Sequence, residues 1–200
     1  MLICRKHNLC YIHIPKTGGI SVSWALYPFL DVMSDAGRKP SPQSPGSFKH
    51  CHVIGHHSIP NQGEGMIRPG DVVACTVRDP FDRMLSIAHS IAGPKEEALL
   101  DKIVRVCGNP ASEYKRPWPW GIQQIGGLQQ IHWATGCNHI MRFENLEQDF
   151  QDLCEKVGLP PIKLPHLNDH SKKTPPKPVL TRETKDLIES VWPEDVKAYG

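Results

Sequence analysis

A glycine-bearing turn near the N-terminus has the residue types that bind phosphate. An apolar segment from Tyr11 to Ile14 leads into Pro-Lys-Thr-Gly-Gly, and a helix-like segment follows from Ser21. Successive backbone N–H groups at the open end of a helix form an anion site, and Lys16 adds a full positive charge. Glycine at positions 18 and 19 lets the backbone approach phosphate closely or adopt a positive φ. These residues predict a phosphate cradle.

A second element of this kind comes later in the chain. The apolar segment 71–77 ends at Arg78-Asp-Pro, and Ser86 follows about two helical turns further on. An arginine at the end of a strand can bind phosphate oxygens through two parallel hydrogen bonds, and Ser86 lies near enough to the same face to add a hydroxyl donor. Two such elements on two strands predict one ligand with two separated phosphates.

The order His-Ile-Pro-Lys-Thr-Gly-Gly-x-Ser of residues 13–21 resembles the 5′-phosphosulfate loop of the sulfotransferases, in particular the carbohydrate sulfotransferases of the heparan sulfate 2-O type and their bacterial and viral relatives. Residues 77–86 resemble the element that holds the cofactor's 3′-phosphate, and residues 143–150 and 195–200 resemble later family segments. The resemblance implies the cofactor 3′-phosphoadenosine 5′-phosphosulfate (PAPS, product PAP), with no metal required. The cofactor-binding residues that it implies are Lys16, Thr17, Gly18, Gly19, Ile20, Ser21, Arg78, Ser86, Lys172, Lys173 and Thr174.

Sulfuryl transfer by in-line attack needs a group that neutralises the leaving phosphate and a base that deprotonates the acceptor. Lys16 is placed for the first role. For the second, the resemblance maps the base onto His56, within the histidine-rich segment 50–58, because the 2-O family members carry a Gly-His-x-Ser-like element there. His57 is the alternative base. A zinc site made of His50, His52, His56 and His57 is less favoured, because these histidines lack the separated pairs of a structural site.

Two positions depart from the family pattern. Ile20 stands where many members have a hydroxyl residue, and Ile54 stands where the 2-O members have a first histidine. Because of these departures, a nucleotide-binding protein without catalysis stays open as an alternative. A kinase or NTPase, which would share the P-loop-like fold, is the other alternative. The sequence lacks the G-x-x-x-x-G-K-[ST] order of that class, because its lysine precedes the glycines.

The acceptor follows from the family alone, which implies a hydroxyl group on a carbohydrate, with a small alcohol or phenol as the alternative. Aromatic and basic residues of the second half of the chain suit an acidic sugar, because aromatic faces pack on sugar C–H groups and cations bind carboxylates. The same tryptophans are equally expected in a core. The residues concerned are Lys115, Arg116, Trp118, Trp120 and Trp133.

Strand and helix signals alternate along the chain. Strands are predicted at 9–14, 71–77 and 139–143, and helices at 21–30, 81–91, 95–107, 144–157 and around 187–192. Such alternation favours an α/β fold, here a P-loop-like three-layer fold with a central parallel sheet flanked by helices, in a single domain over residues 1–200. Segments 34–47, 108–121 and 160–178 are rich in Pro, Gly or polar residues and are predicted to be loops.

The composition of the chain limits its possible partners and location. The chain has 200 residues and a formal net charge of +2, which gives no reason to expect nucleic acid as a partner. Its apolar stretches are too short to span a membrane, so a cytoplasmic protein is expected, or a Golgi lumenal one if the chain belongs to a longer, anchored protein. Seven scattered cysteines predict mostly reduced core thiols.

Overall fold

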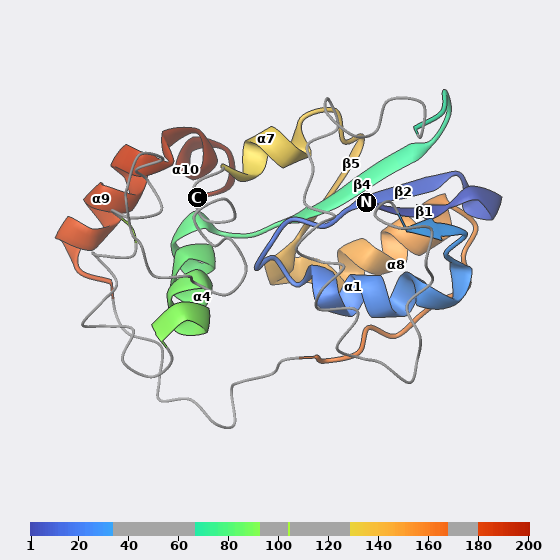
Figure 1. The fold of residues 1–200 in the computed structure, drawn as a ribbon, viewed down its shortest axis with the longest axis horizontal. Coiled ribbons are helices and arrows are strands. Elements are labelled where there is room, and N and C mark those ends of the chain that lie inside the picture. Colours follow the sequence, from blue (N-terminus) through green and yellow to red (C-terminus); the bar gives the residue numbers. More distant parts are fainter. Residues whose placement is uncertain (34–66, 93–103, 105–128, 168–179) are drawn as a thin grey trace. The chain divides into compact units, whose positions relative to one another are not determined.

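The computed structural model describes residues 1–33, 67–92, 104, 129–167 and 180–200 (Figure 1). The chain forms two compact units. Residues 1–77 and 132–167 make a sheet unit, and residues 78–131 and 168–200 make a helical unit. The prediction of a single domain over residues 1–200 stays a prediction.

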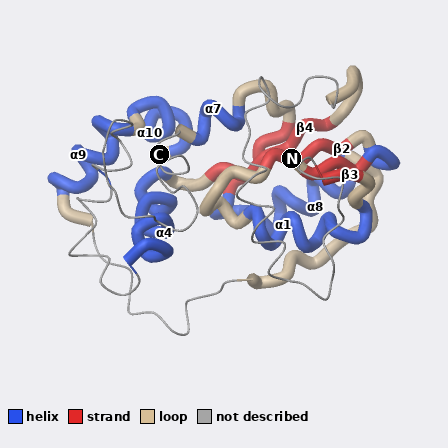
Figure 2. The backbone as a smooth tube through the Cα atoms, viewed as in Figure 1, coloured by secondary structure: helices blue, strands red, loops and turns tan. Residues whose placement is uncertain are grey.

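The sheet unit, whose strands are red in Figure 2, contains one five-stranded sheet in the order β3-β1-β2-β4-β5. Its strands are β1 (Leu2–Cys4), β2 (Leu9–Ile12), β3 (Val32–Met33), β4 (Val72–Val77) and β5 (His139–Arg142). The predicted parallel arrangement holds for β2, β4 and β5, whose register pairs Ile12 with Cys75 and Cys75 with Ile140. The sheet as a whole is mixed, because β1 runs antiparallel to both β2 and β3.

The antiparallel strand β1 has a local cause. A short 3-10 helix, η1 (Arg5–His7), separates β1 from β2, and Asn8 at its end adopts a left-handed conformation with φ of 48°. This tight turn reverses the direction of the chain, so β1 and β2 pair as an antiparallel hairpin. Sequence periodicity missed β1 and β3 because both strands are very short, with three and two residues.

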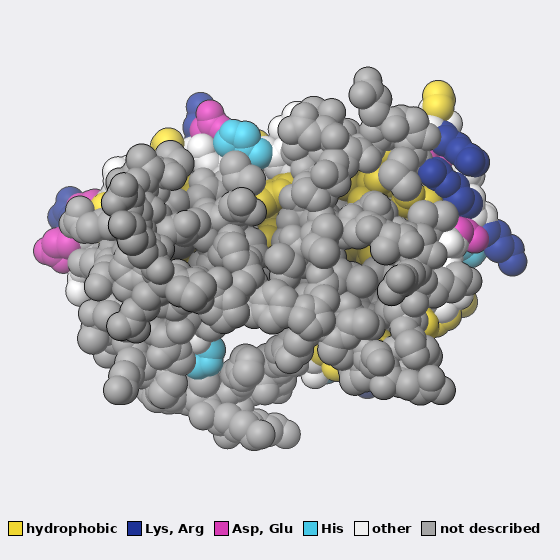
Figure 3. Space-filling model, viewed as in Figure 1, with side chains coloured by type: hydrophobic (Ala, Val, Ile, Leu, Met, Phe, Trp, Pro, Cys, Tyr) yellow, Lys and Arg dark blue, Asp and Glu magenta, His cyan; other side chains and the backbone are white. Residues whose placement is uncertain are grey.

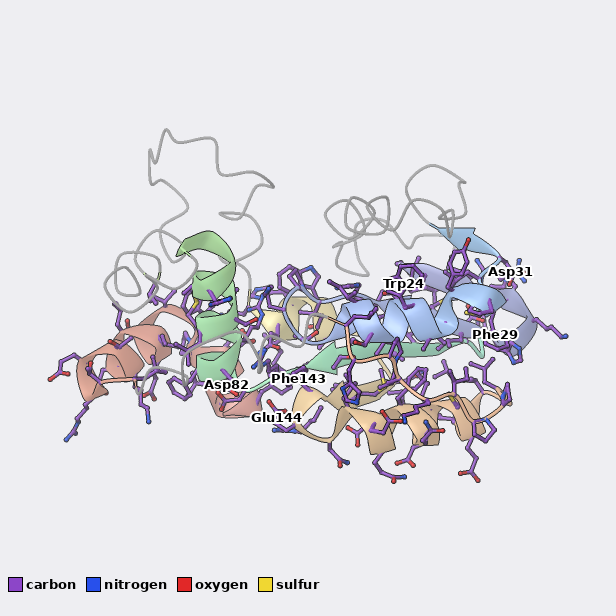
Figure 4. The ribbon with its side chains drawn as sticks, turned by 90° about the horizontal axis from the view of Figure 1, so that it is seen from below. Trp24, Phe29, Asp31, Asp82, Phe143 and Glu144 are labelled. Carbon is purple, nitrogen blue, oxygen red and sulfur yellow. The ribbon has the colours of Figure 1, made fainter. Side chains whose placement is uncertain are left out.

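Two helical segments pack on one face of the sheet (Figures 1 and 4). The first is α1 (Gly19–Leu26), continued by η2 (Tyr27–Phe29), and the second is η5 (Phe143–Asn145) with α8 (Leu146–Lys156). Buried side chains from both helices meet alternate residues of the strands. This core contains Leu9, Tyr11, Ala74, Met141, Val22, Leu26, Phe150 and Leu153. The predicted α/β class is confirmed.

The helical unit contains α4 (Pro80–Ala92), α9 (Arg182–Val191) and α10 (Pro193–Tyr199), and it includes the start of α7 (Gln130–Ala134). Its core joins Met84 and Ala88 of α4 to Ile188 of α9 and to Trp192, with Leu187 and Val191 packed against them. The predicted apolar stripe at 187–192 is therefore confirmed as a core helix. The helix predicted at 95–107 lies outside the described residues, apart from Val104.

All five cysteines in the described part of the chain are free thiols: Cys4, Cys10, Cys75, Cys137 and Cys154. Burial raises the pKa of the Cys4 and Cys10 thiols to about 12, which keeps them protonated and unreactive at neutral pH. The prediction of reduced core thiols is confirmed for the four buried residues, whereas Cys137 is half-buried. Within the same described ranges, no helix is long and apolar enough to cross a membrane.

Candidate functional site

The turn at Lys16 lies between the carboxyl end of β2 and the start of α1, as predicted. The hydroxyl of Thr17 is buried and donates to the carbonyl of Ile14 over 2.9 Å, which closes the turn on itself. Gly18 follows with φ of 83°, and its carbonyl accepts from the N–H of Ser21 at 3.0 Å. The residues of the predicted cradle from Lys16 to Ser21 are thus consecutive members of one turn and one helix start.

Lys16 adopts a left-handed backbone conformation, with φ of 67°. Among the described residues only one other non-glycine residue, Asn8, has a positive φ, and asparagine tolerates that region well. A lysine there costs about 1–2 kcal/mol relative to a right-handed conformation. Strain of this kind persists where the surrounding structure enforces it, and it is typical of ligand-binding turns.

The N-terminus of α1 differs from those of four other described helices. Its N-cap is Gly18, which makes no side-chain capping hydrogen bond, and its first turn contains no acidic residue. In contrast, α4, α8, α9 and α10 all have an acidic residue in the first turn. Because the first N–H groups of a helix have no acceptor within it, the start of α1 offers N–H donors and the positive end of the helix dipole to an anion.

The two glycines of the turn are required by packing inside the protein. A Cβ atom on Gly18 would lie 2.8 Å from Cδ2 of Phe143 and 2.9 Å from Cδ2 of Leu146, which come from the junction between β5 and α8 (Figure 4). A Cβ on Gly19 would lie 2.8 Å from two atoms of the His13 ring. Two reasons are predicted for both glycines, close approach of phosphate and a positive φ, and the positive φ is present only at Gly18.

The His13 ring packs against Gly19 of the turn. The sequence motifs did not identify His13 as a site residue. Its ring is buried, and Nδ1 lies 3.2 Å from Oγ of Ser23, whose hydroxyl donates to the carbonyl of Gly19 at 2.6 Å. Since the single Ser23 hydrogen is used on Gly19, we infer that His13 carries its proton on Nδ1 and donates it to Ser23. This chain of hydrogen bonds fixes the first residue of α1.

Gly18→Ala should destabilise the protein more than Gly70→Ala does. Both glycines have a positive φ, so each alanine is strained by about 1–2 kcal/mol, but only Gly18 has a side chain in the way. Overlap with Phe143 should add about 1–3 kcal/mol. Urea denaturation of the two variants measures the difference. Equal losses of unfolding free energy would show that the Phe143 side chain moves aside without cost and does not constrain position 18.

The second predicted element lies at the start of the helical unit. Arg78 directly follows β4 and is buried, and Asp79 caps α4 by accepting from the N–H of Asp82 at 2.8 Å. Pro80 stands at the first position of the helix, where a missing N–H costs nothing. The Arg78 guanidinium lies 3.6 Å from the Asp82 carboxylate, labelled in Figure 4, and Ser86 is half-buried two turns along α4. In the Arg-Asp-Pro motif, Asp79 is therefore the N-cap of α4, and Arg78 directly precedes it.

Several predicted site residues lie outside the described residues. They are His50, His52, His56 and His57, the late loop residues Lys172, Lys173 and Thr174, and the acceptor candidates Lys115, Arg116, Trp118 and Trp120. Trp133 is described and is 1% exposed, so it belongs to the core and does not form an acceptor surface. Within the described ranges, no three His, Cys, Asp or Glu side chains are grouped as metal ligands.

Comparison of the chain with models of known protein families, with characterised proteins and with solved structures gives no match.

Proposed function

We propose that this protein is a sulfotransferase that moves a sulfuryl group from PAPS to an acceptor hydroxyl. By analogy with the sulfotransferase family, this hydroxyl belongs to a carbohydrate. In this proposal the Lys16 turn and the start of α1 hold the 5′-phosphosulfate, and Arg78 with Ser86 holds the 3′-phosphate. The P-loop-like three-layer fold is part of the same proposal.

One observation supports the proposal most directly. The start of α1 has no side-chain cap, and it follows closely after Lys16, whose backbone is strained. An anion at that helix terminus is favoured by the N–H donors and the dipole, and the left-handed backbone at Lys16 is a cost that a binding role accounts for. The hydroxyl of Thr17 already donates to the Ile14 carbonyl. We therefore expect Thr17 to bind the phosphosulfate through its backbone N–H rather than its side chain.

In the sheet unit, the strand that precedes the Lys16 turn lies beside β4. Strands β2 and β4 are adjacent and parallel, with Leu9 beside Val72 and Ile12 beside Cys75. Their carboxyl ends therefore lie at the same edge of the sheet, where ligands of α/β proteins bind. Lys16 follows β2 by four residues and Arg78 follows β4 directly.

PAPS, when bound, supplies the sulfuryl group and a phosphate leaving group. Lys16 then neutralises the charge that grows on the leaving oxygen, and the backbone N–H groups at the start of α1 share this role. His56 takes the proton of the acceptor hydroxyl as its oxygen attacks sulfur. The acceptor oxygen forms the new bond to sulfur, and the electron pair of the broken bond remains on the phosphate of PAP.

Two measurements test the proposal against its alternatives. A thermal shift with adenosine 3′,5′-bisphosphate is expected, since ligand at 100 times Kd stabilises the native state by about 2.7 kcal/mol. Stabilisation by ATP with Mg²⁺ and not by the bisphosphate would instead support a kinase or NTPase. Radiolabelled sulfate transfer to a panel of glycans, alcohols and phenols then separates an enzyme from a nucleotide-binding protein without catalysis.

Arg78→Ala should weaken adenosine 3′,5′-bisphosphate much more than adenosine 5′-phosphate, because the arginine is proposed to contact only the 3′-phosphate. Loss of a charge-assisted hydrogen bond costs about 1.5–3 kcal/mol, or roughly a tenfold to hundredfold rise in Kd. Titration calorimetry measures both ligands. Arg182→Ala, at an exposed arginine of α9, is the matched control and should change neither affinity. Equal losses for the two ligands would contradict the assignment of Arg78 to the 3′-phosphate.

A further inference from the structure

The main chain of Arg78 is held by a glutamine that no motif singled out. The N–H of Arg78 donates to Oε1 of Gln130 at 2.9 Å, and Nε2 of Gln130 donates back to the carbonyl of Arg78 at 2.8 Å. Both hydrogen bonds are buried, and Gln130 is fully excluded from solvent. A primary amide that pairs with both polar groups of one residue fixes the position of its backbone, whatever the side chain.

Gln130 is itself held by the C-terminal helix. The carboxylate of Asp195 accepts from the N–H of Gln130 at 2.7 Å and from the N–H of Ile131 at 3.0 Å, and so caps the start of α7. In return, the side-chain oxygen of Gln129 accepts from the N–H groups of Glu194 and Asp195 at 2.9 and 3.1 Å, and so caps the start of α10. The two helix starts thus cap each other.

A buried charge lies at the centre of this arrangement. Asp195 is 1% exposed, and its carboxylate lies 3.8 Å from Nη1 of Arg83, which is 3% exposed. Burial raises the pKa of Asp195 above the usual aspartate value, although the two N–H donors and Arg83 act in the opposite direction. Because buried ion pairs contribute little net stability, their best-supported use is to specify one arrangement among several.

We propose that Gln130, fixed in place by Asp195, is a positioning residue for Arg78 and through it for the 3′-phosphate. This inference rests on the proposed function. The amide fixes the backbone of residue 78, and the Asp82 carboxylate lies beside its guanidinium. An arginine that is held at both its main chain and its side chain loses little freedom on binding, so its bidentate contact with phosphate is preorganised.

The test is Gln130→Met, which keeps the size of the side chain and removes both hydrogen bonds. We expect the Kd for adenosine 3′,5′-bisphosphate to rise about tenfold while the Kd for adenosine 5′-phosphate is unchanged, since misplacement by about 1 Å affects the held phosphate alone. Gln130→Glu keeps the acceptor for the Arg78 N–H and should lose less. Gln151→Met is the matched control, because Gln151 donates to the Ile162 carbonyl at 2.7 Å in the sheet unit.

A double variant separates positioning from general stability. In an Arg78→Ala background, Gln130→Met should add no further loss of bisphosphate affinity, because its effect acts through the arginine. Loss of the two buried hydrogen bonds should lower Tm in either case. A merely structural role would weaken both nucleotides alike, and that result would overturn the inference. If Arg78→Ala itself fails to distinguish the two nucleotides, the proposed function fails; if it does distinguish them and Gln130→Met does not, only the positioning role is lost.

Discussion

Lys16→Ala should lower the rate of sulfuryl transfer by about 10²–10³-fold, or about 2.7–4 kcal/mol in the barrier, which is the loss typical of removing one donor to a developing oxyanion. In the proposed mechanism the ammonium group acts where charge grows on the leaving phosphate, so the effect should fall on kcat more than on KM for PAPS. Single-turnover measurements at saturating PAPS separate the chemical step from binding.

The backbone at Lys16 provides an independent readout of stability. Alanine is as strained as lysine at φ of 67°, so Lys16→Ala should keep the backbone strain of the parent protein. Lys16→Gly removes the strain, at a smaller entropic cost, and should unfold at an equal or higher temperature while being equally inactive. A variant that gains stability as it loses activity is the mark of a residue kept for function.

Lys6→Ala is the matched control for the loss of one positive charge. Lys6 is exposed in η1, at the other end of β2 from Lys16, where Figure 3 shows several basic side chains. It should change neither rate nor stability. Near-normal turnover of Lys16→Ala at saturating PAPS would remove Lys16 from the mechanism.

His56→Ala should lower transfer by roughly a hundredfold or more while adenosine 3′,5′-bisphosphate binds as before, because a general base acts on the chemical step alone. His56 lies outside the described residues, so this prediction depends on the sequence and the family resemblance. In the parent protein, a histidine base produces an acidic limb in the pH–rate profile, since protonated imidazole cannot accept a proton. That limb should vanish in the variant.

His57→Ala is the internal control and should lose much less activity. If the two variants exchange these behaviours, the base is His57. If both keep full activity, the base lies elsewhere, and the acidic residues would be examined next. Unchanged Kd values for the bisphosphate in both variants are needed for either conclusion, because they show that the cofactor site is intact.

The sequence predicted the main elements of the candidate site because they depend on neighbours along the chain. Proline before Lys16 and two glycines after it favour a turn, and Asp79 followed by proline favours the start of a helix. Both features lie where expected, at the carboxyl ends of β2 and β4. The α/β class was likewise predictable, since the apolar runs of β2 and β4 are typical of strands buried on both faces.

Tertiary structure decided what holds those elements in place. Gly18 packs against Phe143, and Gln130 reaches the main chain of Arg78 across 52 positions of sequence and is held by Asp195 across 65 more. Such partners carry no local signal, because a hydrogen bond between distant residues depends on the register of the strands and helices that bring them together. The sequence by itself therefore determined where the turn and the helix starts of the proposed anion site lie, and only the packing of distant segments determined which residues hold them in place.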